Sequence, residues 1–154
     1  MILSHACIYG IQTLVYTAMQ GSSAYVSTRR AAVEMGIPFQ FISKVMQILS
    51  EKKLVISRRG TSGGIMLARE AGEISLLDII EAIDGLSLFQ ECILGLPGCG
   101  HATPCPLHEE WATEREKLRE YFKSTSLADV VAGIRVFSHR ISIEEFSDKI
   151  LHIS

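Results

Sequence analysis

The sequence predicts a mainly α-helical fold that carries one small β-hairpin. Apolar residues recur at helical spacing over most of the chain, and two short apolar runs, 54–56 and 65–67, flank a glycine-rich loop. Hydrophobic residues make up 47% of the 154 residues, which is enough to bury a proper core. We therefore expect a folded chain rather than a disordered one.

Three helices are expected before the hairpin. Ile8, Ile11 and Val15 recur at helical spacing in the first helix, which spans 5–20 and is ended by Gly21. The ends of the next two helices are marked by capping residues, a glycine and a proline. These signals are Ser27 or Thr28 at the start of the second helix, Gly36 at its end and Pro38 near the first turn of the third helix, which runs to about Lys52.

Further helices are expected after the hairpin. A serine caps a helix over 76–83, and a longer helix spans 107–123 with an apolar stripe along one side. Two segments that resemble capping boxes, 126–129 and 142–145, predict two short helices in the tail.

The second and third helices have the pattern of a helix-turn-helix. A small residue, Ala32, lets the two helices cross closely, and Gly36 suits the tight turn. On the third helix the polar side chains face away from the apolar ones, as a face that reads the DNA major groove requires. The hairpin would then be a wing, with Arg58 and Arg59 at its root for phosphate or minor-groove contact. The candidate DNA-binding residues are Arg29, Pro38, Gln40, Ser43, Lys44, Gln47, Arg58, Arg59 and Gly60.

Charge divides the chain into a basic and an acidic part. Residues 1–69 hold eight basic and two acidic residues, a net charge of +6, and because the whole chain carries −2, residues 70–154 carry −8. This split is typical of an anion-binding module joined to a partner or sensor module. Chance clustering of surface charge and a three-helix protein-interaction module remain alternatives. A nucleotide-binding phosphate loop is excluded, since G-x-x-x-x-G-K-[ST] is absent.

Three cysteines lie in an irregular loop, 90–106, that is rich in glycine and proline. Cys92, Cys99 and Cys105 have the spacing C-x6-C-x5-C, and His108 follows as a fourth candidate ligand. Thiolates select zinc or an iron–sulfur cluster, and these gaps are longer than the C-x2–4-C of structural zinc sites. Zinc, a metal-free disulfide switch and three unrelated buried thiols stay open as alternatives.

No targeting segment or membrane span is visible. The chain starts without a basic region or a cleavage site, and no apolar run reaches about 20 residues. We expect a cytoplasmic protein without a membrane partner, in which four cysteines indicate metal ligands or redox thiols. Cys7, on the first helix, is expected in the core, although it could approach a cluster from a partner subunit.

Five segments of the chain match the pattern of one family. They are Leu3-Ser4…Tyr9-Gly10…Leu14-Val15-Tyr16, Ile37-Pro38-Phe39-Gln40-Phe41-Ile42, Leu54-Val55…Arg59-Gly60…Gly63-Gly64-Ile65, Cys105-Pro106-Leu107-His108…Trp111 and Ser126-Leu127-Ala128-Asp129. Over about residues 1–131 the chain resembles the Rrf-two (Rrf2) family of winged-helix transcription regulators, in its IscR-like and NsrR-like iron–sulfur sensors.

The resemblance implies a homodimer that binds a double-stranded DNA operator and is held together by the long helix. It implies minor-groove contact by Arg59 and base reading from the third helix, by Gln40, Ser43 and Lys44. It also implies cluster ligation by Cys92, Cys99 and Cys105. In IscR-like members a histidine at the position of His108 is the fourth ligand, and in NsrR-like members a carboxylate of the partner's first helix can serve.

The sequence departs from the family pattern in two places. The first cysteine gap is six residues, where five is common, and Ile8 stands where relatives often have an acidic residue. These differences favour His108 as the fourth ligand, or Cys7 or His5 across the dimer, and a two-iron cluster over a four-iron one.

Four parts are expected in the chain. They are a winged helix-turn-helix DNA-binding domain (1–85), a cysteine-rich cluster-binding loop (86–106), a dimerisation helix (107–125) and a C-terminal helical tail (126–154). The expected function is a transcriptional repressor, not an enzyme, whose operator binding is controlled by a cluster that senses redox state, nitric oxide or iron–sulfur status. The alternatives are a regulator of the same fold that uses zinc or thiol oxidation and, more remotely, a small redox protein.

Overall fold

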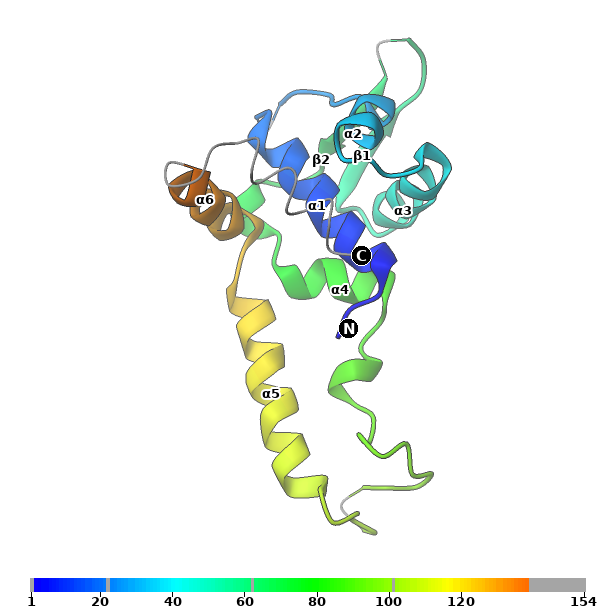
Figure 1. Ribbon diagram of the computed structural model, residues 1–154, viewed down its shortest axis with the longest axis vertical. Helices are drawn as coiled ribbons and strands as arrows, with labels where there is room; N and C mark the ends of the chain where they lie inside the picture. Colours follow the sequence, from blue (N-terminus) through cyan, green and yellow to red (C-terminus); the bar gives the residue numbers. More distant parts are fainter. Residues whose placement is uncertain (1, 22, 62, 101, 139–154) are drawn as a thin grey trace.

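The computed structural model describes residues 2–21, 23–61, 63–100 and 102–138. Within those ranges the chain forms six α-helices and one two-stranded antiparallel sheet (Figure 1). The order is α1 (His5–Met19), α2 (Thr28–Glu34), α3 (Phe39–Glu51), β1 (Val55–Arg58), β2 (Gly64–Leu67), α4 (Leu76–Ile83), α5 (His108–Ser124) and α6 (Leu127–Ser138). Two short 3-10 helices, Ala71–Glu73 and Ser87–Phe89, flank α4. The predicted fold class, mainly α with a β-hairpin, is confirmed.

The ends of the helices follow local signals in the sequence. Ser27 caps α2, because its hydroxyl accepts a hydrogen bond of 3.3 Å from the N–H of Arg30. Gly36 adopts the left-handed conformation, with φ +64°, in the turn between α2 and α3. Pro38 is the N-cap of α3 and so lies just outside its first turn. The helix predicted at 142–145 falls outside the described residues.

The hairpin is held against the helices by a third extended segment. β1 pairs with β2 from Val55 opposite Leu67 to Arg58 opposite Gly64, so β1 reaches further than the predicted strand over 54–56. Val26, just before α2, exchanges two backbone hydrogen bonds with Ile65 of β2, at 2.8 and 2.9 Å. The start of α2 is therefore tied to the root of the hairpin.

The core lies around α1, which packs against α3, α4, α6 and β2 (Figure 1). Leu14 of α1, Ile42 and Leu49 of α3 and Ile79 of α4 are all fully enclosed. Each such side chain stabilises the fold by about 1.5–3 kcal/mol relative to an exposed position. Gly10 of α1 allows this close packing, because a Cβ there would lie 2.5 Å from the end of the Ile83 side chain and 3.2 Å from a methyl group of Val45. The basic helix-turn-helix, α2 and α3, is thereby packed on α1 and α4 through α3.

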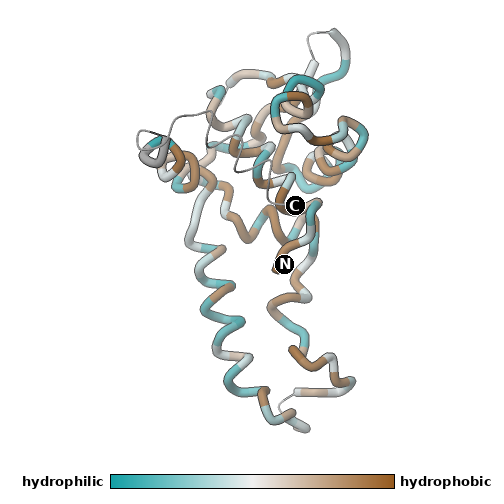
Figure 2. The backbone as a smooth tube through the Cα atoms, in the orientation of Figure 1, coloured by the Kyte–Doolittle hydropathy of each residue, from teal (hydrophilic) through white to brown (hydrophobic). Residues whose placement is uncertain are grey.

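The helix α5 projects from this body. The chain between α4 and α5 runs down beside α5 and turns to meet its first residue at the far end (Figure 1). No residue of α5 is buried, and Tyr121 is 60% exposed, although Leu118 and Phe122 pack on a small cluster around Cys7 and Phe89. Figure 2 shows that α5 is mainly hydrophilic, whereas α1 and α4 carry long hydrophobic stretches. No helix in the described part of the chain is long and apolar enough to cross a membrane.

Candidate DNA-binding face and cysteine centre

The outer face of α3 carries polar side chains, as its sequence periodicity predicts. Ile42, Val45 and Leu49 point into the core, with at most 3% of their surface exposed. The opposite face is therefore turned to solvent. Its exposed polar residues are Gln40, Ser43, Lys44, Gln47 and Glu51. Amide, hydroxyl and ammonium groups in this arrangement can form hydrogen bonds with base edges and phosphates.

A groove of about 610 Å³ lies between α3, the start of α2 and the hairpin. The predicted DNA-binding residues that line it are Arg29, Ser43, Gln47, Arg58, Arg59 and Gly60. Pro38, Gln40 and Lys44 do not line the groove, but each is exposed beside it on or before α3. The fold thus gathers three arginines and the polar face of one helix on a single concave surface.

Two aromatic residues that the sequence did not predict as part of the site contact arginines of the groove: Phe39, which lines it, and Tyr25, which does not. The guanidinium carbon of Arg29 lies 4.4 Å from the centre of the Phe39 ring. That of Arg58 lies 5.8 Å from the centre of the Tyr25 ring. Both distances are within the range of cation–π interactions. The sequence shows only that aromatic and basic residues occur in the same region, which does not specify a contact.

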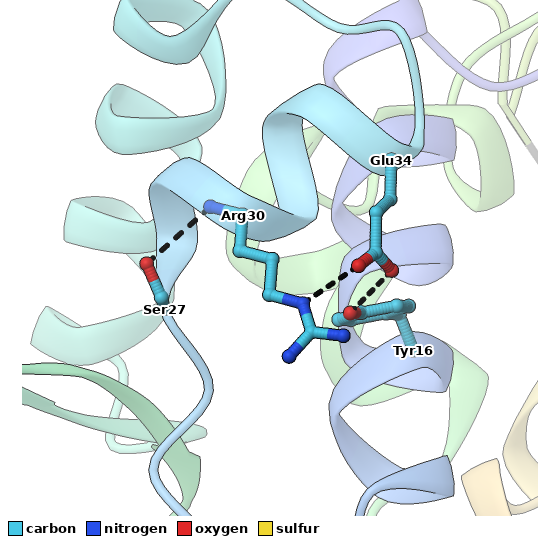
Figure 3. A network of polar contacts seen from close by, with 4 residues as sticks. All are labelled: Tyr16, Ser27, Arg30 and Glu34. Carbon is cyan, nitrogen blue, oxygen red and sulfur yellow. Dashed lines mark hydrogen bonds and ion pairs between the residues drawn. The ribbon is translucent and has the colours of Figure 1, made fainter.

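A polar network ties the first helix of the helix-turn-helix to α1 (Figure 3). The Tyr16 hydroxyl donates a hydrogen bond of 2.6 Å to Glu34, and the Arg30 Nε donates one of 2.7 Å to the other carboxylate oxygen. These two bonds hold the pKa of Glu34 below its usual range, the Tyr16 hydroxyl having the larger effect. Because Tyr16 is on α1 and Glu34 ends α2, the network orients α2.

The three cysteines of the loop converge on one point. The Sγ atoms of Cys92, Cys99 and Cys105 all lie within 4.8 Å of one another, and those of Cys92 and Cys105 are 3.6 Å apart. His108, the first residue of α5, places its Nδ1 3.4 Å from the Cys99 Sγ. Two glycines in the left-handed conformation, Gly95 (φ +62°) and Gly98 (φ +74°), make the turns that bring the thiols together.

The thiols differ in their electrostatic surroundings. The backbone N–H of Leu96, helped by that of Leu94, stabilises the Cys92 thiolate and lowers its pKa to about 7. The pKa of Cys105 is raised, chiefly by burial. Thiolates are the form that binds metal, and backbone amides directed at sulfur are typical of iron–sulfur sites.

A cavity of about 230 Å³ opens beside the thiols. It is lined by the three cysteines and His108, and also by Trp111 and Arg115 of α5. Arg115 brings a positive charge that would offset the negative charge of a thiolate-ligated centre. The donor set, the amides and this charge all fit an iron–sulfur cluster, and the thiols alone also fit zinc.

Comparison with known proteins assigns the chain to a family. The model of the Rrf2 family, described as an iron-dependent transcriptional regulator, matches residues 3–133. The chain belongs to the Rrf2 family. A provisionally described HTH-type transcriptional regulator of Mycobacterium tuberculosis is 36% identical to it over 135 residues, covering 86% of this chain and 83% of the relative. The sequence resemblance is confirmed, and the protein is a transcriptional regulator with a DNA-binding helix-turn-helix.

Solved structures of similar proteins have the same fold as this Rrf2 regulator. IscR of T. potens has a TM-score of 0.66 and 25% identity, covering 86% of this chain and 87% of its own. CymR of B. subtilis, described as a global cysteine regulator, has a TM-score of 0.73 and 24% identity, covering 84% of this chain and 95% of its own. At this level of identity, the similarity to CymR shows only that the two chains share a fold.

The two residues predicted as ligands from a partner subunit lie on α1 of the Rrf2 fold. Cys7 is fully enclosed by the core of its own protomer, and this burial raises the pKa of its thiol to about 12. His5 is exposed and makes an edge-to-face contact with Tyr9, with ring centres 6.1 Å apart. The surroundings of Cys7 are those of a core thiol. Ligation across a dimer stays a prediction for both residues.

Hydrogen bonds connect the cysteine loop of the Rrf2 regulator to α5 and the body. The carbonyl of Glu91, next to Cys92, accepts bonds from the Trp111 indole at 3.0 Å and from Arg115 at 2.7 Å. At the other end of α5, the carbonyl of Thr125 accepts a bond of 2.9 Å from the N–H of Leu76 in α4. The loop, α5 and α4 therefore form one continuous chain of contacts.

Proposed function

We propose that this Rrf2 regulator binds its operator as a homodimer and that an iron–sulfur cluster controls the binding. Cys92, Cys99, Cys105 and His108 would hold the cluster, with two iron atoms favoured over four. The observation that carries the proposal is the convergence of three thiols within 4.8 Å, beside an imidazole nitrogen 3.4 Å from one of them. When bound, the cluster supplies a centre that responds to redox state, nitric oxide or iron–sulfur supply.

The chain's own residues supply the coupling. Cys92 adjoins Glu91, whose carbonyl is held by Trp111 and Arg115, so a change in the shape of the loop acts directly on α5. α5 in turn bonds to the start of α4 through Thr125. A shift of α5 would alter how far apart the two DNA-binding faces of a dimer stand.

The exposure of α5 supports the proposed dimer. No residue of α5 is buried. Tyr121 on this helix is 60% exposed, and Leu107, just before the helix, is 44% exposed. These residues leave apolar surface that a second copy of the chain could cover. Two recognition helices must lie about 34 Å apart to enter successive major grooves, so small movements of α5 affect affinity. Base reading by Gln40, Ser43 and Lys44, minor-groove contact by Arg59 and repression by operator occupancy follow within this proposal.

A second candidate function is regulation by thiol oxidation without a cluster. The observation that favours it is the 3.6 Å distance between the Cys92 and Cys105 sulfurs, which needs little movement to become a disulfide. Hydrogen peroxide would take two electrons from the two thiols: the S–S bond forms, the O–O bond breaks, and the two thiol protons leave in two molecules of water. The cysteine spacing and the half-buried thiols serve this reaction as well as they serve a metal.

The first test is spectroscopy of protein purified without oxygen. A bound cluster gives broad visible absorption together with iron and acid-labile sulfide in similar amounts. Replacing Cys92, Cys99 or Cys105 with serine should abolish the colour, because each removes one thiolate. Cys7→Ser is the control: with His108 as the fourth ligand it should keep the colour, and loss of colour in a folded Cys7→Ser variant would make Cys7 the partner-subunit ligand instead.

Each of the other outcomes has a definite meaning. Colour and iron retained in the three loop variants would overturn the ligand assignment. A colourless wild-type protein that stays free of iron after reconstitution would overturn the cluster proposal. A peroxide-induced Cys92–Cys105 disulfide that changes operator affinity would then select the second candidate, whereas stoichiometric zinc would show that the thiols hold zinc in place of a cluster. His108→Ala should shift the visible bands, and an unchanged spectrum would remove His108 from the ligand set.

A further inference from the structure

Two arginines that line the DNA-side groove each rest on an aromatic ring. Arg29 comes from α2 and Arg58 from the end of β1, so they reach the groove from different elements. Their guanidinium carbons lie 4.4 and 5.8 Å from the ring centres of Phe39 and Tyr25. The same pairing of an arginine with a ring therefore occurs twice, at two places on the groove.

The two rings are held in different ways, Phe39 by the core and Tyr25 by its anchored backbone, with 38% of Tyr25 exposed. Phe39 is the first residue of α3 and packs against the main core. Tyr25 precedes Val26, whose backbone N–H and carbonyl are both bonded to Ile65 of the hairpin. An arginine side chain has many rotamers, and ordering it on binding costs free energy. A rigid ring beneath the guanidinium removes part of that cost in advance.

The two guanidinium groups keep their charge available for an anion. Among the described residues, the ion pairs are formed by Arg30, Arg69, Lys117, Arg119 and Lys123, and neither Arg29 nor Arg58 has an acidic partner within 4 Å. Glu51 also lines the groove, where its carboxylate accepts a hydrogen bond of 3.5 Å from the Gln47 amide and forms no ion pair with either arginine. Each arginine thus has an apolar ring on one side and solvent on the other.

We propose that Arg29 and Arg58 are two preset phosphate clamps on the DNA-side groove, and that Phe39 and Tyr25 are the residues that position them. The ligand is the sugar–phosphate backbone of duplex DNA, contacted without regard to sequence. The inference rests on the DNA-binding function of the chain and is independent of any cluster. Arg59, which lines the same groove without an aromatic partner among the described residues, has no such preset position.

The test measures the affinity of the full chain for a short duplex of arbitrary sequence as a function of salt. Arg29→Ala or Arg58→Ala removes a phosphate contact. The slope of log K against log salt, which is negative, should therefore decrease in magnitude by about one for each protomer bound. Phe39→Leu and Tyr25→Leu keep an apolar side chain but remove the π face. They should weaken binding about two- to five-fold while leaving the slope unchanged, because the contact still forms from a less ordered arginine.

A double-mutant cycle separates positioning from a general structural effect. Phe39→Leu should have no further effect in the Arg29→Ala background, and Tyr25→Leu none in the Arg58→Ala background. The rescue variants Phe39→Tyr and Tyr25→Phe restore a ring and should recover the affinity lost in the leucine variants. Thermal unfolding of each variant reports whether the fold is intact.

Three results would overturn the inference. Additive effects in both cycles would show that the rings do not act through the arginines. Unchanged affinity in the leucine variants would show that the rings do not matter. A wild-type chain that binds no duplex at all would show that duplex DNA is not the ligand. Loss of cluster control with DNA binding intact would refute only the proposed function.

Discussion

At the scale of single residues, surroundings decide what each of the four cysteines can do. Cys7 and Cys92 are both thiols, yet burial raises the pKa of Cys7 to about 12 while backbone N–H groups lower that of Cys92 to about 7. Spacing alone distinguishes Cys7 from the loop cysteines, but it does not reveal that Cys92 is the one stabilised as a thiolate. That depends on the peptide groups of Leu94 and Leu96, whose orientation only the fold determines.

The metal-free protein should therefore react with iodoacetamide first at Cys92. The thiolate is the reactive form, so labelling of Cys92 should rise as the pH climbs through about 7, whereas a thiol with the ordinary pKa of 9.0 reacts only at higher pH. Cys7 should be labelled only after unfolding. Peptide mass spectrometry over a pH series measures both, and a Cys92 midpoint near 9.0 would contradict the prediction.

The lowered pKa of Cys92 also makes the stability of the fold depend on pH. The pKa of Cys92 is lower in the folded chain, so the folded state favours the thiolate. The stabilisation is complete above the unfolded pKa of 9.0 and is lost as the pH falls through about 7. Metal-free protein should therefore unfold at a lower temperature on the acid side of that range.

At the scale of elements, the hairpin depends on the close approach of three backbone segments. Gly64, at the start of β2, faces the backbone of Val26, and a Cβ there would clash with the Val26 carbonyl group. The two hydrogen bonds between Val26 and Ile65 need this approach. The hairpin, with Arg58 at its end, is therefore positioned by a residue that has no side chain.

Gly64→Ala should destabilise the protein by about 1–3 kcal/mol, because backbone atoms must move to admit the methyl group. Binding to DNA should weaken as well, since the hairpin and Arg58 shift. Gly72→Ala is the matched control, because nothing lies within 4 Å of a Cβ at that position. Urea unfolding measures the difference, and equal stability of the two variants would refute the clash.

The helices and the hairpin could be predicted because their signals are local. The apolar spacing of α1 and α3, the Ser27 cap and the turn at Gly36 each act within a few residues. The convergence of the cysteines was also predictable in outline, from three thiols in one short loop. The bonds of Trp111 and Arg115 to Glu91 were not, because they join residues 20 and 24 positions apart. No spacing rule indicates which side chain of α5 meets which carbonyl.

At the scale of the whole molecule, the cysteine centre and the DNA-side groove lie at opposite ends (Figure 1). α5 spans most of the distance between the cysteine loop and the body. The contacts at its two ends, through Glu91 and Thr125, are the means by which one end can influence the other.

Trp111→Phe tests that connection. The ring remains, but the hydrogen bond of 3.0 Å to the Glu91 carbonyl is lost. We expect the cluster to bind still, while the ratio of operator affinities with and without it moves toward one. Parallel titrations of the loaded and metal-free forms measure the ratio. A ratio equal to that of the wild type would show that the coupling does not pass through this bond.

The division of charge along the chain has a kinetic consequence. The basic residues of α2, α3 and the hairpin stand at one end, and the described residues that follow, 70–100 and 102–138, hold twelve acidic residues against five basic ones. Such a molecule is an electric dipole, which a polyanion turns as it approaches. DNA would attract the groove and repel the far end, so that most encounters begin in the productive orientation. Association, more than dissociation, should then slow as added salt screens the field.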